Sequence, residues 1–338
     1  MRSGRAHREW RIFLGLSAAI AVISACFGYL IGNHTLHSAV MGVLHSIAIA
    51  TPILLFEIKG QNTRLLRRLR RQPLAVYFGF RSLFYIAVII GGMVIVRLLF
   101  DDSPTVFDET FRPSIVFAVA MSVGANLVFE VGRLLGFGTL KNLLTGRYVQ
   151  PRREQRAFAL IDMKDSTGMA ERLGAIRFHE LLNAFFQDVA DAAFECRAEI
   201  HKYVGDEAIL TWSRTDAIAN GDCVACPFIV QDRIAANSER YKSRFGAVPQ
   251  FRAALHWGEI VAGEIGDVRR EIAYVGDTLN VAARLLEASK SLGRDILVSQ
   301  DLLQIVKLPA GLKATPLPTL AIRGRTAPLG ISALSRVD

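Results

Sequence analysis

The chain has 338 residues, of which 51% are hydrophobic, and a formal net charge of +9. The length suits about two domains, and the hydrophobic fraction is high for a fully soluble protein. The positive charge does not indicate nucleic acid, because a cluster of arginines lies between apolar segments, as in membrane proteins. That cluster comprises Arg64, Arg67, Arg68, Arg70 and Arg71.

Four apolar segments in residues 1–136 predict an all-α membrane domain of four transmembrane helices. Each is close to the ~20 residues that cross a bilayer as a helix. The expected spans are Ile12 to Gly32, Ser38 to Phe56, Phe78 to Phe100 and Ser114 to Phe129. A cleaved signal peptide would have a shorter apolar core and would not explain the later segments. We therefore expect a multi-pass protein with the lipid bilayer as a partner.

The charges between these segments predict the orientation. Residues 1–11 and 57–73 are basic, whereas residues 101–113 contain Asp101, Asp102, Asp108 and Glu109. The positive-inside rule then places the N-terminus and the C-terminal half in the cytoplasm, with the spans in the cell (inner) membrane.

Ionisable and polar side chains also occur within or beside the spans, namely Glu57, Arg81, Asn126 and Glu130. Such groups are costly in a membrane and can mark a signal or ion site. The sequence favours a simpler interpretation, in which Glu57, Arg81 and Glu130 lie at helix ends and reach the headgroups.

Residues 137–153 are expected to form a linker helix, because Leu140, Leu143 and Leu144 have helical spacing. Pro151 is expected to end it, since the residue before a proline disfavours helix. The linker could transmit dimer geometry or serve as a passive tether. Residues 154–338 then form the cytoplasmic domain.

The cytoplasmic half alternates short apolar runs with amphipathic segments. The expected elements are a strand at Ala157–Met163, a helix with its apolar stripe from Phe178 to Val189, a hairpin of Glu199–Val204 and Ala208–Trp212, a strand pair of Phe251–Trp257 and Glu259–Ile265 broken at Gly258, and a helix at Asp277–Leu292. This order predicts an α+β fold with helices covering a largely antiparallel sheet.

Two aspartates stand where strands end, Asp162 after an apolar run and Asp206 in the hairpin turn. Carboxylate oxygens suit Mg²⁺ and Mn²⁺, so the pair could hold two such ions. Aspartates that only form turns or caps are the alternative from spacing alone. Asn280 and Arg284 are four residues apart and share a face of the last helix.

Four motifs in this order resemble the class III adenylate and guanylate cyclases. They are Phe158 to Thr167, Lys202 to Asp206, His256 to Gly263, and Tyr274 to Arg284. The resemblance covers about Phe158 to Ser299 and implies a ferredoxin-like catalytic domain. It also implies an adenylate cyclase that converts ATP to cyclic AMP and pyrophosphate.

The resemblance implies a role for each matching residue. The metal ligands would be Asp162, the backbone carbonyl of Ile161, and Asp206, which together hold two Mg²⁺ or Mn²⁺ ions per site. The catalytic residues would be Asn280, which positions the ribose, and Arg284, which offsets charge on the phosphate. The substrate-binding residues would be Lys202 at the purine edge, Ala273 and Asp277. Because the two sets act across an interface in this family, a homodimer is implied.

Ala273 departs from the family pattern, since alanine has no side-chain acceptor for the adenine amino group. A guanylate or dual-specificity cyclase is therefore one alternative, and a non-catalytic nucleotide-binding receptor module on a membrane scaffold is another. The residues 204–208 loosely resemble the signature turn of diguanylate cyclases but lack its paired glycines. Residues 164–166 differ from the family's usual loop, with no expected loss of metal binding.

The cysteines do not predict a metal site. Cys223 and Cys226 form a single C-x-x-C without a second pair, whereas structural zinc normally takes four ligands. We expect ordinary buried thiols.

Overall fold

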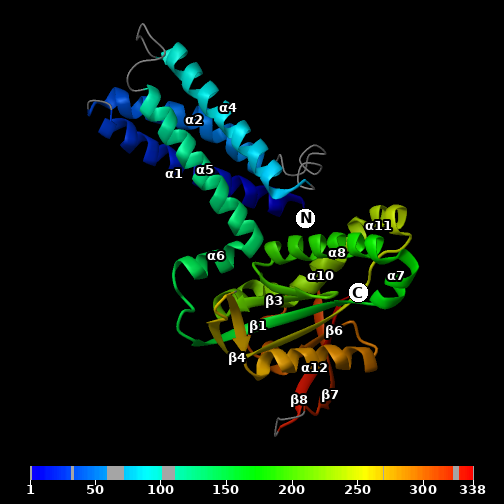
Figure 1. The fold of residues 1–338 in the computed structure, drawn as a ribbon. Helices are drawn as coiled ribbons and strands as arrows, with labels where there is room; N and C mark the ends of the chain where they lie inside the picture. Colours follow the sequence, from blue (N-terminus) through cyan, green and yellow to red (C-terminus); the bar gives the residue numbers. More distant parts are fainter. Residues whose placement is uncertain are drawn as a thin grey trace. The chain divides into compact units, whose positions relative to one another are not determined.

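The computed structural model divides the chain into two compact units, Met1–Leu135 and Gly136–Asp338 (Figure 1). Each is described by itself. The residues that the structure describes are 2–31, 34–58, 72–100, 111–268, 270–322 and 327–337.

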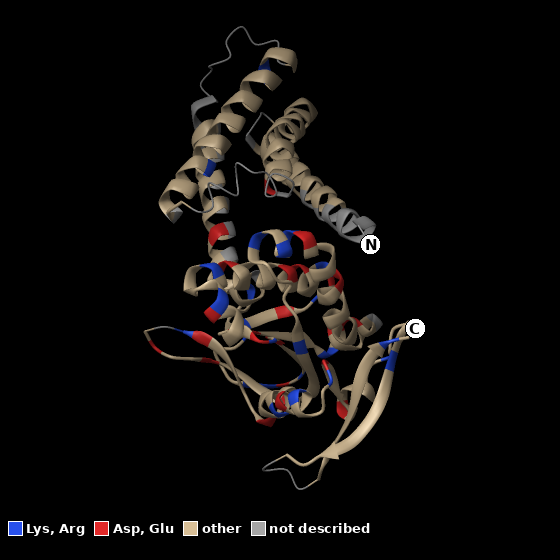
Figure 2. Cartoon of the chain, turned by 90° about the vertical axis from the view of Figure 1, so that its right-hand side faces the viewer, with Lys and Arg blue, Asp and Glu red and all other residues tan. Residues whose placement is uncertain are grey.

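Unit 1 consists of long helices over its described residues: α1 (Arg2–Ile31), α2 (Leu36–Ile58), α4 (Leu74–Phe100) and α5 (Phe111–Leu135). Three of these described helices are long and apolar enough to cross a membrane, over Phe13–Leu30, Leu36–Glu57 and Ala75–Phe100. Charged residues are sparse over the three spans Phe13–Leu30, Leu36–Glu57 and Ala75–Phe100 and frequent on unit 2 (Figure 2).

The fourth predicted span coincides with α5, a helix of 25 residues. Among the described helices α5 is not one of the three that meet the length and composition of a span, so the four-span arrangement stays a prediction. The arginine-rich residues 59–71 and the acidic residues 101–110, on which the orientation depends, lie outside the described residues.

Arg81 does not reach toward headgroups, and that interpretation is wrong. Its side chain is 0% exposed and donates hydrogen bonds to Glu57 of α2, at 2.6 Å, and to Glu130 of α5, at 3.1 Å. Tyr85, one turn along α4, accepts from Arg81 at 2.9 Å and donates to Glu57. A charge without a counter-charge is costly to bury, so the guanidinium is paired with carboxylates from two other helices. We call these four residues the Arg81 cluster.

Unit 2 begins with α6 (Phe137–Leu144), the predicted linker helix. It ends seven residues before Pro151, because the Thr145 hydroxyl caps the Lys141 carbonyl at 2.8 Å and Gly146 turns the chain with a φ of 61°. The turns and bends of residues 145–150 that follow lead into the first strand.

The remainder of unit 2 is one sheet with helices on both faces, which confirms the α+β prediction (Figure 1). The strands are β1 (Arg152–Met163), β2 (Glu199–Val204), β3 (Glu207–Ser213), β4 (Phe251–Ile265), β5 (Glu271–Val275), β6 (Ile296–Ser299), β7 (Leu312–Leu320) and β8 (Leu329–Arg336). The helices are α7 (Ser166–Leu173), α8 (Ala175–Glu195), α9 (Arg214–Ile218), α10 (Asp222–Ala236), α11 (Ser238–Phe245), α12 (Asp277–Ser291) and α13 (Gln300–Leu303).

The strand order is β2-β3-β1-β4-β6-β8-β7, with β5 paired to β4. All of these pairs are antiparallel except β4 with β6. One face of the sheet packs against α8 and α10, and the other packs against α12, so two apolar cores lie on either side of it. The buried thiols Cys196, Cys223 and Cys226 belong to the core on the α8 side, as predicted for ordinary cysteines.

Gly258 does not break a strand pair, and that prediction is wrong. β4 runs through it as one strand of 15 residues and pairs with β1 along its length, from Met163↔Phe251 to Arg152↔Ala262. The glycine instead permits a close approach, since a Cβ there would lie 2.5 Å from the Thr278 Oγ1 atom of α12. The hairpin partner of the second half of β4 is β5.

Candidate active site

Three carboxylates gather where β1 ends against the β2–β3 turn. Asp162 pairs in register with Glu207, and the Met163 amide donates to the Asp206 carbonyl at 3.4 Å. Gly205, with a φ of 62°, makes this tight turn possible. Ile161 precedes Asp162 on β1, so its carbonyl belongs to the same end of the strand. We call Asp162, Asp206 and Glu207 the acidic end.

The charges at the acidic end are mutually unfavourable. Burial, followed by the neighbouring Asp206 carboxylate, raises the pKa of Asp162 above its ordinary value. Burial and the same two aspartates raise the pKa of Glu207 to about 7. Lys290 of α12 offsets part of this charge, with its Nζ atom 3.8 Å from the Asp162 Oδ2 atom.

The acidic end fits a divalent cation. Its donors are hard oxygen atoms, and a cation would relieve the repulsion that, after burial, raises both pKa values. Over the described ranges there is no group of three or more histidine, cysteine or acidic side chains arranged to hold a metal ion. Magnesium sites that also use substrate phosphates need only one or two protein carboxylates.

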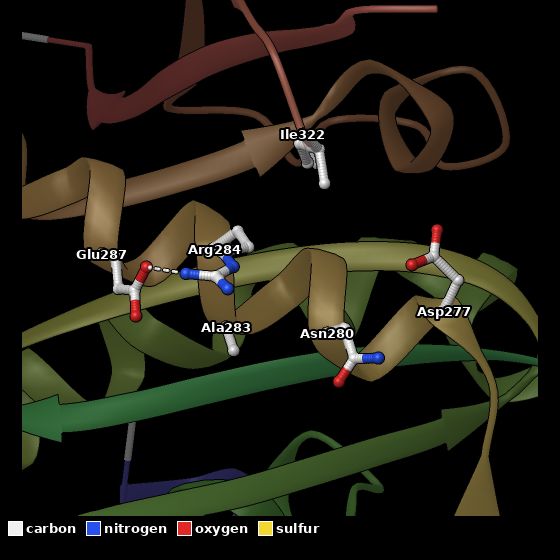
Figure 3. A pocket seen from close by; sticks show the side chains of 6 residues that line it. All are labelled: Asp277, Asn280, Ala283, Arg284, Glu287 and Ile322. Atoms are coloured by element: carbon white, nitrogen blue, oxygen red, sulfur yellow. Dashed lines mark hydrogen bonds and ion pairs between the residues drawn. The ribbon is translucent and has the colours of Figure 1, made fainter. Parts of the chain in front are cut away.

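The predicted catalytic residues lie on an exposed stripe of α12 (Figure 3). Asp277, Asn280, Ala283, Arg284 and Glu287 recur at helical spacing and line a hollow of about 460 Å³, which Ile322 completes. We call these five residues the α12 stripe. The Arg284 side chain is 56% exposed, and its guanidinium donates to Glu287 at 3.0 Å. It is therefore held along the helix but accessible to a ligand or another chain.

A close contact between β4 and α12 fixes the start of the stripe. The helix follows Gly276, whose φ of 150° suits glycine, and the Thr278 hydroxyl donates to the Glu259 carbonyl at 2.6 Å. Asp277 occupies the first turn, where a carboxylate favours the helix dipole.

The side chains of Lys202 and Ala273 lie on opposite faces of the sheet. Lys202 pairs with Ile209, whose side chain belongs to the core on the α12 side. Ala273 pairs with Gly263 and alternates with Tyr274, which packs against that same core. Because side chains alternate along a strand, Tyr274 lies on the face of Lys202 and the Ala273 methyl group lies on the opposite face.

A buried arginine underlies this part of the α12 face. Arg156 is 2% exposed and pairs with Glu199 at 2.6 Å and with Glu154 at 3.1 Å. Its guanidinium carbon lies 5.2 Å from the centre of the Tyr274 ring, and the His201 ring lies 4.5 Å from the same ring. We call Arg156, His201 and Tyr274 the aromatic stack.

The family follows from the sequence profile of known proteins that matches most of unit 2. The profile described as "Adenylate and Guanylate cyclase catalytic domain" matches residues 149–330, more than half of the chain. This chain belongs to the class III adenylate and guanylate cyclase family.

The cyclase is also similar to named relatives. It is 37% identical to Adenylate cyclase 2 of Rhizobium meliloti (strain 1021) over 306 residues, which are 87% of this chain and 83% of that protein. It is 26% identical to Adenylate cyclase 1 of the same organism over 185 residues, which are 53% of this chain but 27% of that protein.

Among solved structures, the cyclase resembles a bacterial light-regulated adenylyl cyclase with a TM-score of 0.54. The two are 13% identical, and the match covers 67% of this chain and 65% of that chain. This likeness concerns the fold.

Sequence reasoning missed three features around the site. Glu207 directly follows Asp206, and the predicted hairpin register could have placed it opposite Asp162. Lys290 is six residues beyond Arg284, and no local pattern indicates its contact with β1. Arg156 lies in the charged start of β1, before the apolar run that predicts the strand.

Proposed function

We propose that the cyclase is an adenylate cyclase that converts ATP to 3′,5′-cyclic AMP and pyrophosphate in a homodimer with two shared sites. In the reaction, the ribose 3′-oxygen attacks the α-phosphorus, and the bond from that phosphorus to the pyrophosphate oxygen breaks. The observation that carries the proposal is the separation of the two halves of the site within one chain.

That separation can be measured along α12. Asp162 contacts Lys290, which is ten residues beyond Asn280. At ~1.5 Å per residue this is about 15 Å along the helix axis. By the same rise, Arg284 lies about 9 Å along the axis from Lys290. The contact with Asp162 is therefore made at the far end of α12 from Asn280, and neither Asn280 nor Arg284 makes it. A two-fold arrangement of two copies can set each acidic end against the partner's stripe and complete two equivalent sites.

The acidic end would hold the metals through Asp162, Asp206 and the Ile161 carbonyl. Bound Mg²⁺ or Mn²⁺ supplies Lewis acidity at the attacking oxygen and the triphosphate. The exposed Arg284 guanidinium would stabilise charge on the α-phosphate, because planar, preorganised donors suit phosphate oxygens. Asn280 would hold the ribose, and Asp277 lines the same hollow.

We further propose that unit 1 anchors the enzyme in the cell membrane as a multi-pass domain with α5 as its fourth span. Three apolar helices of sufficient length support the anchoring. An even number of spans puts both ends of unit 1 on one side, and the arginine-rich segments favour the cytoplasm for that side.

Mixing inactive chains tests the shared site. Asp206→Ala and Arg284→Ala should each abolish cyclic AMP formation by the purified full-length enzyme. Co-expressed, they should recover up to about a quarter of wild-type activity, since half of the dimers are mixed and each holds one intact site. Asp162→Ala mixed with Asp206→Ala is the matched control, because both defects lie in the same half and no site is restored. Recovery in the control, or none in the test pair, would refute the shared site.

A guanylate or dual-specificity cyclase is the second candidate, because Ala273 offers no acceptor to a base. Competition between ATP and GTP in the presence of Mn²⁺ decides between them. A larger kcat/KM for GTP would replace the adenylate assignment while leaving the shared site intact.

A further inference from the structure

His201 is placed on the α12 face by a bulge in β2. Ile200 pairs with Leu210 and Lys202 with Ile209, so His201 is the extra residue between them. A bulge of this kind re-aims side chains, and the His201 ring reaches the Tyr274 ring at 4.5 Å on the face that Lys202 shares. The cation and the imidazole are therefore neighbours on one face.

The ring nitrogens of His201 are available for hydrogen bonds to a ligand. His201 is half-buried. In the part of the chain that the structure describes, neither of its ring nitrogens makes a hydrogen bond, and neither is a fully buried polar atom that lacks a partner. Burial, followed by the Lys202 charge, lowers the pKa of His201 to about 4. The ring is thus neutral at pH 7, with one nitrogen as a donor and the other as an acceptor.

The stack also fixes the ring in place. Tyr274 packs against the Arg156 guanidinium. That guanidinium is itself fixed, because it donates hydrogen bonds to Glu154, Glu199 and the Thr211 hydroxyl. Phe158 packs edge-on against the same tyrosine, with ring centres 5.6 Å apart. An acceptor on a ring held this way loses little freedom when it binds a ligand.

We propose that His201 is a base-reading residue, whose imidazole accepts a hydrogen bond from the exocyclic amino group of adenine while Lys202 donates to the adjacent ring nitrogen. This rests on the proposed function. It supplies the acceptor that Ala273 lacks, and it does so from the sheet face that carries Lys202, which the Ala273 methyl group does not share.

The test is the ratio of kcat/KM for ATP to that for GTP, measured on full-length enzyme with Mn²⁺. His201→Phe keeps a ring against Tyr274 but has no acceptor. We expect it to lower the ratio about five- to tenfold, as loss of one hydrogen bond does, mainly through a higher KM for ATP. His201→Gln retains an acceptor and should recover part of the ratio. His179→Phe, at an exposed histidine on α8, is the matched control and should leave the ratio unchanged.

The outcomes separate the two proposals. If the wild-type enzyme forms no cyclic nucleotide from either substrate, the proposed function fails. If it does, but His201→Phe keeps the wild-type ratio and GTP turnover, the role of His201 is overturned. A shift produced by Ala273→Ser and not by His201→Phe would also overturn it. Should His201→Phe fail to fold, the ratio for His201→Leu decides, because leucine also lacks an acceptor and a merely structural histidine predicts equal losses for ATP and GTP.

Discussion

Each unit contains an arginine that is almost fully buried between two glutamates and beside a tyrosine ring, but the two surroundings differ. Arg81 in unit 1 joins three helices, and the side chains of its carboxylate partners are only 13% and 11% exposed. Arg156 in unit 2 is bound within one sheet, and its partner Glu199 is 44% exposed. Water can therefore solvate one carboxylate beside Arg156 but reaches neither partner of Arg81 as readily.

The two guanidinium groups also differ in how fully they are satisfied. The Arg156 Nε atom donates to the Thr211 hydroxyl at 3.0 Å. The Arg81 Nε atom is buried and has no hydrogen-bond partner among the described residues. The sheet thus gives each nitrogen of its arginine a hydrogen-bond partner, whereas the helices leave one nitrogen of Arg81 unpaired. We therefore expect burial of the carboxylate partners, more than burial of the arginine, to set the free-energy cost of losing the cation.

Arg81→Met should show the largest effect. It leaves Glu57 and Glu130 without the cation that they share, and removing one partner of a buried pair costs about 3–5 kcal/mol. Thermal unfolding of the full chain in detergent measures the loss. Arg81→Lys keeps the charge but not the geometry that reaches both glutamates. Its free energy of unfolding should therefore lie between those of wild type and Arg81→Met. A loss below ~1 kcal/mol for Arg81→Met would mean that the Arg81 cluster does not hold unit 1 together.

Arg156→Met should cost less, about 2 kcal/mol, because hydrogen bonds to charged groups contribute about 1.5–3 kcal/mol and the exposed Glu199 can be solvated afterwards. The same unfolding experiment measures it. Glu199→Gln, which keeps a hydrogen-bond acceptor at the partly exposed position, is the milder control. The comparison breaks if Arg156→Met is more damaging than Arg81→Met.

Apart from Glu154, which is two residues from Arg156 on the same strand, the partners of the two arginines could not be predicted from the sequence, for one physical reason. Glu57 and Glu130 are 24 and 49 residues from Arg81, and Glu199 is 43 residues from Arg156. For charged residues at a helix end or at the start of a strand, the local sequence pattern predicts exposure to solvent. Only the tertiary arrangement of the helices or the register of the sheet brings them together.

Local patterns were sufficient elsewhere. The apolar run before Asp162 and the turn at Asp206 predicted both elements, and their meeting follows from β1 pairing with β3. The four-residue spacing of Asn280 and Arg284 predicted their shared face on α12. Gly258 failed as a turn signal because a glycine required for close approach to Thr278 looks the same in sequence. The functional roles of these residues stay predictions.

The aromatic stack gives unit 2 a pH dependence through His201. Its pKa is about 4 in the folded chain, against 6.5 ordinarily. Between these values the unfolded chain binds the proton more readily, so stability should fall as the pH is lowered from about 6.5 to 4. Allowing for partial exposure, we expect about 1–2 kcal/mol. Wild type should lose more stability than His201→Phe as the pH is lowered through this range, because the variant has no imidazole to protonate. Parallel curves would exclude His201 as the source.

The tyrosine hydroxyls provide the smallest and sharpest contrast. Tyr85 is buried, accepts from Arg81 at 2.9 Å and donates to Glu57, so Tyr85→Phe should cost about 1 kcal/mol. The Tyr274 hydroxyl makes no hydrogen bond within the described residues, and its contacts with Arg156 and His201 are made by the ring. Tyr274→Phe should therefore change the free energy of unfolding by less than about 0.5 kcal/mol. Equally small effects of the two substitutions in the same melting experiment would show that both arginines contact their tyrosines through the ring alone.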